Sequence, residues 1–372
     1  MKIPFVDLQA QYQNLKIEID QAIQSVIKDT AFIRGKYVET FEQAFAKAYG
    51  VKHCISVANG TDAIYITLKM LGIGAGDEVI TVANSWISTS ETITQTGARV
   101  VFVDIDPDYY TIDAAKIAAK ITPKTKALLP VHLYGQPAQI DVIQKLCQRY
   151  GVFLVEDCAQ AHFATYQGQY VGTFGIAGTF SFYPGKNLGA YGDAGAIITN
   201  DDDLAQKVRM YANHGALKKH VHTMEGINSR MDGLQGAILT AKLPYVKQWN
   251  QQRFKNAQYY SHLLSAIEGI TVPAVRPNAE HIFHVYAIRT ARRDAMQGYL
   301  KQQGIESAIH YPTALPFLPA YAYLNHTPQD FPVASAYQDQ LLSLPMFPEL
   351  TAQHIEYVVE QIREFGKNAP LV

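Results

Sequence analysis

The sequence predicts an α/β protein: a large domain with a mostly parallel seven-stranded sheet and helices on both faces, followed by a smaller C-terminal α/β domain. Short apolar runs alternate with helical patterns from residue 53 onward, as they do in proteins with parallel sheets. The length of 372 residues exceeds one average domain. Because 48% of the residues are hydrophobic, the chain can bury a large core and further surface against a partner subunit.

The elements of the large domain follow from apolar periodicity. Apolar residues recur at helical spacing from Gln11 to Asp29, and a second helix is expected from Val38 to Tyr49. Apolar runs then predict the strands of the sheet, at residues 53–58, 78–82, 99–104, 127–130, 152–156, 178–183 and 194–199. Helical patterns lie between them at residues 63–71, 88–96, 114–120 and 139–150.

The C-terminal part begins a new unit. Helical patterns dominate from residue 202 to 267, a strand–helix unit starts near residues 283–289, and a last helix is expected near 352–365. We therefore predict a large domain over residues 1–249, which includes the N-terminal helical segment, and a small domain over 250–372.

Charge and cysteine content exclude several classes of protein. The formal net charge is -1, so we expect no binding to nucleic acid or to anionic membrane. Cys54, Cys147 and Cys158 are widely spaced, which favours buried reduced thiols over a disulfide framework or a metal site. The first eleven residues lack a signal-peptide core, and no apolar stretch reaches transmembrane length. The expected protein is soluble and cytoplasmic.

Two short motifs hold candidate catalytic side chains. The run at residues 152–156 leads into Asp157, and an acid at the carboxyl end of a strand often faces a ligand. Lys186 lies in a glycine-flanked turn after the run at 178–183, among apolar neighbours, where desolvation makes a lysine amine nucleophilic. Taken singly, each motif also fits an ordinary role, as a capping acid or as a solvated loop lysine.

The two side chains together fit one cofactor. Pyridoxal phosphate needs an amine to hold its aldehyde and a carboxylate to keep its pyridine nitrogen protonated. Lys186 and Asp157 supply these groups from the ends of successive strands. The sequence therefore predicts a pyridoxal phosphate site, with Lys186 as the catalytic residue. His162 lies near the same centre, where we expect it to pack rather than to hydrogen-bond Asp157.

The remaining parts of the cofactor have candidate partners. Asn59, Gly60 and Thr61 connect a strand to a helix through a tight turn, which presents backbone N–H groups to an anion, although a plain capped turn has the same sequence. Ser181 offers a further hydroxyl for the phosphate. Trp86 follows the next strand and has the flat face needed to stack on the ring, or it packs in the core.

Several motifs, in this order along almost the whole chain, resemble the sugar nucleotide aminotransferases of the DegT/DnrJ/StrS family. The most specific are Ser181–Gly189 and Gly226–Asp232, with Asn59–Ala63 and Glu156–His162 beside them. Further matches lie at residues 32–36, 309–312 and 342–346. The resemblance implies the pyridoxal-phosphate-dependent fold type I, as in aspartate aminotransferase, and a homodimer with shared active sites.

The resemblance also implies roles for individual residues. Lys186 forms the Schiff base with the cofactor and Asp157 pairs with the pyridinium. Cofactor contacts are implied for Gly60, Thr61, Trp86, Gln160, Ser181 and Asn228, the last reaching across from the partner subunit. Substrate contacts are implied for Tyr183, His214, Lys219 and His310. Lys219 lies in a basic run that suits a diphosphate, although a solvated charged loop has the same composition.

The implied substrates are a nucleotide-linked keto sugar and L-glutamate. Residues 182–196 are most similar to enzymes that aminate C3 of dTDP-3-keto-6-deoxyhexoses of the gluco or galacto series. Alternatives are C4 amination, a UDP- or GDP-linked sugar, and a non-catalytic regulatory protein on the same fold. Related dehydratases carry histidine in place of the lysine, so Lys186 argues against that activity. Phe163 and His220 depart from the family pattern, and we expect both to lie near the sugar site.

Overall fold

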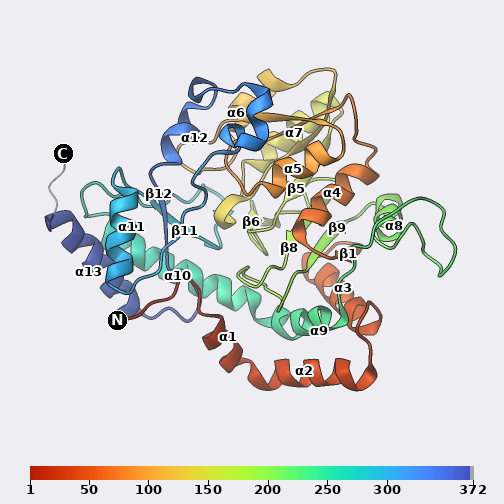
Figure 1. Ribbon diagram of the computed structural model, residues 1–372, viewed down its shortest axis with the longest axis horizontal. Helices are drawn as coiled ribbons and strands as arrows, with labels where there is room; N and C mark the ends of the chain where they lie inside the picture. The colour runs from red at the N-terminus through yellow and green to blue at the C-terminus, as the bar shows by residue number, and fades with distance from the viewer. Residues whose placement is uncertain (369–372) are drawn as a thin grey trace.

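The computed structural model describes residues 1–368 and has a seven-stranded sheet at its centre (Figure 1). Its order is β1-β9-β8-β5-β4-β2-β3, and all neighbours are parallel except where β9 meets β1 and β8. The strands are β1 (His53–Val57), β2 (Glu78–Val82), β3 (Arg99–Val103), β4 (Thr125–Leu129), β5 (Phe153–Asp157), β8 (Ala177–Ser181) and β9 (Gly195–Thr199). The predicted mostly parallel sheet and its strands are confirmed.

Helices cover both faces of this sheet because its strands are apolar on both sides. Cys54 of β1 packs in one cluster with Phe41 and Phe45 of α3, whereas Ile55 packs in another with Ile66 of α4 and Leu204 of α8. Successive strand residues point to opposite faces, so the two clusters lie on opposite sides. The helices of this region are α3 (Lys36–Tyr49), α4 (Gly60–Met70), α5 (Ser88–Gln95), α6 (Ala114–Ile117), α7 (Ile140–Tyr150), α8 (Asp202–Tyr211) and α9 (Gly233–Lys242).

The N-terminal helix expected from residue 11 to 29 is two helices, α1 (Leu8–Asn14) and α2 (Lys16–Asp29). Leu15 between them has φ -121° and ψ 19°, which is not helical, and its side chain is buried with Ile19 and Ile238. Packing of Leu15 against α9 therefore overrides the continuous apolar period. Helix α2 lies along α9 at the edge of the molecule (Figure 1).

The C-terminal part contains α10 (Val246–Leu264), β11 (Tyr286–Arg289), α11 (Arg293–Gln302), α12 (Pro332–Tyr337), β12 (Leu341–Leu344) and α13 (Ala352–Asn368). Strands β11 and β12 form an antiparallel pair. Strand β12 was not predicted, because its four residues are all buried and show no alternation. The expected boundary at residue 249 falls inside α10, and Ile3 packs in the C-terminal core, so the division into two domains stays a prediction.

Short elements complete the chain. A three-stranded sheet has the order β10 (Ala279–Glu280), β6 (Thr165–Tyr166), β7 (Gln169–Tyr170). The 3-10 helices are η1 (Ala118–Lys120), η2 (Leu133–Gly135), η3 (Leu243–Tyr245), η4 (Leu315–Phe317), η5 (Pro319–Leu324) and η6 (Pro328–Asp330). All three cysteines are buried and free, as expected. Within residues 1–368, none of the helices combines the length and apolarity needed to span a bilayer.

Candidate active site

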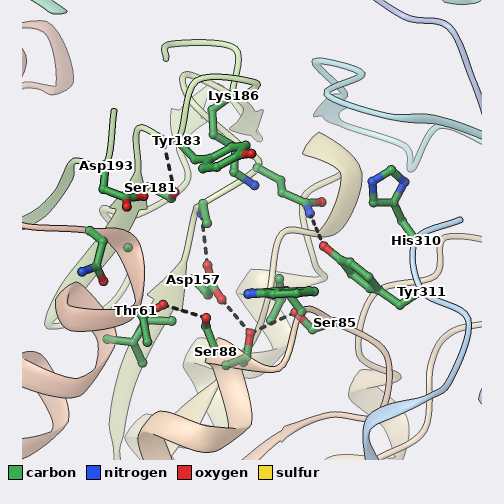
Figure 2. Close-up of a pocket in the computed structure, with 18 residues that line it drawn as sticks. Thr61, Ser85, Ser88, Asp157, Ser181, Tyr183, Lys186, Asp193, His310 and Tyr311 are labelled. Carbon is green, nitrogen blue, oxygen red and sulfur yellow. Dashed lines mark hydrogen bonds between the residues drawn. The ribbon is translucent and has the colours of Figure 1, made fainter. Parts of the chain in front are cut away.

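A cavity of about 440 Å³ lies at the carboxyl ends of β5 and β8, where ligands bind in sheets of this kind. Figure 2 shows side chains from both halves of the chain converging on it. The structure brings together most of the residues singled out in the sequence: Gly60, Thr61, Trp86, Asp157, Gln160, Ser181, Tyr183, Lys186 and His310.

Asp157 and Lys186 face this one cavity. Asp157 ends β5 and is 4% exposed. Its Oδ2 accepts from the Thr89 hydroxyl at 2.9 Å and its Oδ1 from the Ala159 N–H at 3.1 Å. Burial raises the pKa of Asp157, while these donors and the Lys186 ammonium oppose that rise. A cation placed against Asp157 would favour its charged form further.

Lys186 has an unusually weak basicity for a lysine. Desolvation lowers the pKa of its amine to about 8, and the nearby carboxylate of Asp157 opposes the shift. The amine is therefore partly uncharged near neutral pH, which is the state that attacks an aldehyde. The turn that carries it is closed by hydrogen bonds from Lys186 N to Tyr183 O at 2.8 Å and from Ala190 N to Phe182 O at 2.7 Å.

The N-terminus of α4 forms a cradle beside this pair. The Asn59 side chain caps the helix by accepting from Asp62 N at 2.8 Å, which leaves the first helical N–H groups, at Gly60 and Thr61, for an external anion. A Cβ on Gly60 would lie 2.5 Å from the Cβ of Ser181, so only glycine lets the start of α4 lie this close to the end of β8. The Thr61 hydroxyl lies 2.7 Å from that of Ser88.

Gln160 is held in one orientation. Its Oε1 accepts from Tyr134 N at 2.6 Å, and its Nε2 donates to the Tyr311 hydroxyl at 3.0 Å. Tyr311 lines the cavity beside Trp86, with ring centroids 5.7 Å apart. Tyr134, Tyr311 and Thr89 were not predicted as site residues from the sequence. Tyr311 follows His310 in the matched stretch 309–312, and this was the only signal for it.

Three predicted residues lie outside the cavity of their own chain. His214, Lys219 and Asn228 are absent from its lining. They belong to the stretch between α8 and α9, in which Asn213 pairs with Asn228 through backbone bridging. The structure therefore does not bring these three residues to the candidate site of their own chain.

The expectation for Phe163 is wrong. Its ring packs on Tyr49 and Tyr170, its N–H donates to the Tyr49 hydroxyl at 2.7 Å, and it lines a second cavity beside Lys247. The residue has φ 63°, and the aromatic packing holds it there. Phe163 therefore points away from the candidate active site, and the departure says nothing about the sugar. His220, with φ 66°, is likewise absent from the cavity lining.

His162 packs, as expected. It is fully buried, and its ring lies against Phe180 and Phe182. Burial lowers its pKa to about 3, so it is neutral at physiological pH.

Among residues 1–368, one cluster has metal-ligand geometry: His132, Glu156 and Cys158. Its polar atoms already have protein partners. His132 lies 3.0 Å from Glu156 through Nε2 and accepts from Ala138 N through Nδ1. Glu156 also accepts three backbone N–H groups from residues 172–175. The cluster serves the fold by fixing the loop before β8.

Known proteins resemble this chain over nearly its full length. A pleiotropic regulatory protein of Geobacillus stearothermophilus is 45% identical, over 99% of this chain and 100% of that protein. The dTDP-3-amino-3,6-dideoxy-alpha-D-galactopyranose transaminase of Aneurinibacillus thermoaerophilus is 41% identical, over 98% and 99%. The UDP-N-acetyl-3-dehydro-alpha-D-glucosamine 3-aminotransferase of Acidithiobacillus ferrooxidans is 41% identical, over 97% of each.

Solved structures agree. The crystal structure of S. venezuelae DesV, in complex with a ketimine intermediate, has a TM-score of 0.97 and 39% identity over 99% of this chain and 100% of DesV. The fold and these relatives define the class as pyridoxal-phosphate-dependent aminotransferases. Residues 13–363 match the DegT/DnrJ/EryC1/StrS aminotransferase family, and the chain belongs to that family.

Proposed function

We propose that this protein aminates a nucleotide-linked keto sugar, with pyridoxal phosphate as cofactor and L-glutamate as amine donor. The favoured substrate is a dTDP-3-keto-6-deoxyhexose of the gluco or galacto series, which becomes the 3-amino sugar. The observation that carries the proposal is the convergence of Lys186 and Asp157 in one cavity beside the helix N-terminus at Gly60. That set of groups matches an aldehyde, a ring nitrogen and a phosphate.

The residues fit the cofactor part by part. Gly60, Thr61 and Ser181 would hold the phosphate, because Gly60 leaves open a cradle that a side chain would fill. Asp157 would face the ring nitrogen, and Gln160 would donate its free N–H to the ring hydroxyl. Trp86 is 59% exposed and lines the cavity, which leaves its face available for stacking. When bound, pyridoxal phosphate supplies an electron sink for the carbon that loses its proton.

The side chains that line the cavity would have separate roles in the reaction. Lys186 Nζ would hold the aldehyde, and its free amine would take the proton from the α-carbon of the amine donor and deliver it to the carbon that had been the aldehyde. Its pKa of about 8 suits both directions of transfer near neutral pH. The charged Asp157 would keep the proton on the ring nitrogen. Tyr183 and His310 line the cavity and would contact the substrate.

Position C3 is supported by two relatives with different nucleotides. The dTDP-linked and the UDP-linked enzymes are each 41% identical to this chain, and both names place the amino group at position 3. The UDP-linked sugar is therefore the second candidate. Incubation of the holoenzyme with L-glutamate and each keto sugar, followed by mass spectrometry and NMR of the product, distinguishes the two. If the holoenzyme aminates neither sugar, the substrate assignment is wrong.

A homodimer with shared sites is part of the proposal. His214, Lys219 and Asn228 lie outside their own cavity. Apolar side chains are exposed on α2, in the segment after it and between α8 and α9, and we expect the partner subunit to cover them: Ile17, Ile27, Phe32, Ile33, Leu217 and Val221. We place Asn228 at the partner's phosphate and the basic residues near Lys219 at the partner's sugar diphosphate.

Subunit complementation tests the shared site. Lys186→Ala and Asn228→Ala chains, each inactive as a homodimer, are co-expressed with different tags and the mixed dimer is purified. Because one of its two sites would receive a native Lys186 and a native Asn228, the mixed dimer regains activity. An inactive mixed dimer, or a monomer by light scattering, contradicts the shared site.

The 45% identical regulatory relative favours one alternative of another class, a regulatory protein on this fold. Asp157, Gln160 and Lys186 weigh against loss of the cofactor, since a protein without it has no chemical need for all three. The visible absorbance of the protein after reconstitution with pyridoxal phosphate decides between them. A cytoplasmic location remains part of the proposal, on the composition of the chain.

A further inference from the structure

Lys242, the last residue of α9, is a buried lysine without an ionic partner. Its side chain is 0% exposed, and no carboxylate among residues 1–368 forms an ion pair with it. Burying an unpaired ammonium is costly, and proteins rarely do so without another compensating interaction. Burial lowers the pKa of this amine to about 8, so a large fraction still carries its charge near neutral pH. The compensation must come from polar groups that face Nζ.

Two groups face it, one in the turn that carries Lys186 and one in the residue directly after that turn. Nζ donates to the carbonyl of Gly189 at 2.8 Å and lies 4.2 Å from the ring centroid of Tyr191. A carbonyl dipole and an aromatic face are the neutral groups that best stabilise a buried cation. The backbone at Gly189 is packed tightly against Pro184 on the other side of the turn, because a Cβ at residue 189 would overlap the Pro184 backbone.

A second residue of α9 holds the same turn. The Gln235 amide accepts from Tyr191 N at 2.9 Å and donates to Tyr191 O at 3.4 Å. Gln235 and Lys242 are seven residues apart, which places them on one face of the helix. Helix α9 is itself tightly packed, because a Cβ on Gly236 would lie 3.0 Å from the backbone of Tyr37 and Val38. Lys242 and Gln235 therefore attach the end of the turn to a tightly packed helix.

We propose that Lys242 is a positioning residue, which fixes Lys186 against the cofactor by holding the Gly189 carbonyl and the Tyr191 ring. The proposal rests on the role given above to Lys186. Lys186 lies three residues before Gly189, inside a loop closed at Phe182 and Ala190. Displacement of one end of so short a loop moves the amine, and a displacement of about 1 Å at a reacting group can cost ~100-fold in rate.

The test is Lys242→Met, which keeps the length and volume of the side chain and removes its charge and its donor. We expect kcat to fall by roughly 10-fold or more with KM changed less than threefold, because the substrate contacts are untouched. The visible absorbance of the reconstituted protein should shift or titrate at a different pH, since the amine meets the cofactor in altered geometry. Pyridoxal phosphate should also react more slowly with the apo-protein.

Two further variants complete the design. Gln235→Ala removes the other contact to Tyr191 and should change the spectrum in the same direction by less. It also serves as the test if Lys242→Met does not fold. Lys247→Met is the matched control, because Lys247 lies over Phe163 and Tyr170 and does not touch the turn.

The outcomes separate this inference from the proposed function. An unchanged spectrum and unchanged kcat per bound cofactor in Lys242→Met, with only thermal stability lowered, assign Lys242 a purely structural role and overturn the inference. If Lys247→Met reproduces the effect of Lys242→Met, the inference fails as well. Failure of the unaltered protein to react with pyridoxal phosphate would overturn the proposed function, and this inference with it.

Discussion

Gln160 Nε2 and the Tyr311 hydroxyl are joined by a hydrogen bond of 3.0 Å between residues 151 positions apart in the sequence. The Gln160 oxygen is already occupied by Tyr134 N, so the amide cannot rotate without losing both bonds. One N–H of Gln160 therefore remains directed at the cavity. Tyr311, from the C-terminal half, thus orients Gln160, the proposed contact to the ring hydroxyl, which follows the end of β5.

Tyr311→Phe tests this relationship. The variant keeps the ring beside Trp86 and removes the acceptor for Gln160. Loss of one such hydrogen bond, worth about 1 kcal/mol, should weaken the binding of pyridoxal phosphate by roughly fivefold. The dissociation constant is measured by quenching of tryptophan fluorescence. Tyr323→Phe, at an exposed ring outside the cavity, is the control and should bind normally. Equal affinities in all three proteins would show that the bond does not orient Gln160.

Lys186→Ala should abolish turnover and remove the visible absorbance of the reconstituted protein. The reason is chemical, since no other amine lines the cavity within residues 1–368. We expect a loss of at least ~1000-fold in kcat, because anchor and proton carrier are lost together. Lys255→Ala, an exposed lysine of α10, should behave as the unaltered protein. Substantial turnover in Lys186→Ala would mean that another group carries the proton.

The pH dependence of cofactor attachment follows from the pKa of Lys186, which desolvation lowers to about 8. A lysine is protonated and unreactive below its pKa and is a free amine above it. The rate at which apo-protein captures pyridoxal phosphate should therefore rise between about pH 7 and 9 and then level off. Stopped-flow absorbance gives the midpoint. A rate that keeps rising toward 10.5, the ordinary value for lysine, would show that the pocket does not lower this pKa.

Gly60→Ala should damage the phosphate cradle. The new methyl group would lie 2.5 Å from the Cβ and 3.0 Å from the Cα of Ser181, so β8 and α4 must separate. Overpacking of this kind costs about 1–3 kcal/mol, and it would occur at the proposed phosphate site. We expect a lower melting temperature and cofactor affinity reduced by ~10-fold or more.

Gly298→Ala is the matched control for this substitution. Gly298 lies within α11, and nothing is within 4 Å of a Cβ built there. Alanine should raise the stability of the helix by about 0.5–1 kcal/mol and leave the cofactor affinity unchanged. A Gly60→Ala protein that behaves like Gly298→Ala would show that β8 and α4 separate without cost and that the cradle is not tight.

The sequence by itself determined the strands of the sheet, its mostly parallel direction, and the positions of Asp157 and Lys186 at strand ends. These features are local, because apolar period and glycine turns are set by each residue and its near neighbours. The resemblance of motifs added the family. The continuous helix expected at the N-terminus and the missed strand β12 show the limit, since buried packing against distant elements decided both.

Only the tertiary structure decided which side chains meet. The hydroxyl of Tyr311, the Thr89 bond to Asp157 and the hold of Lys242 on the Gly189 carbonyl join residues that are 151, 68 and 53 positions apart. The tertiary structure also shows that Phe163 lines a different cavity and not the expected sugar site. Contacts across such separations depend on how whole elements pack, and on the desolvation that packing imposes on each polar group. A local pattern of residue types encodes neither the packing of distant elements nor the desolvation of their polar groups.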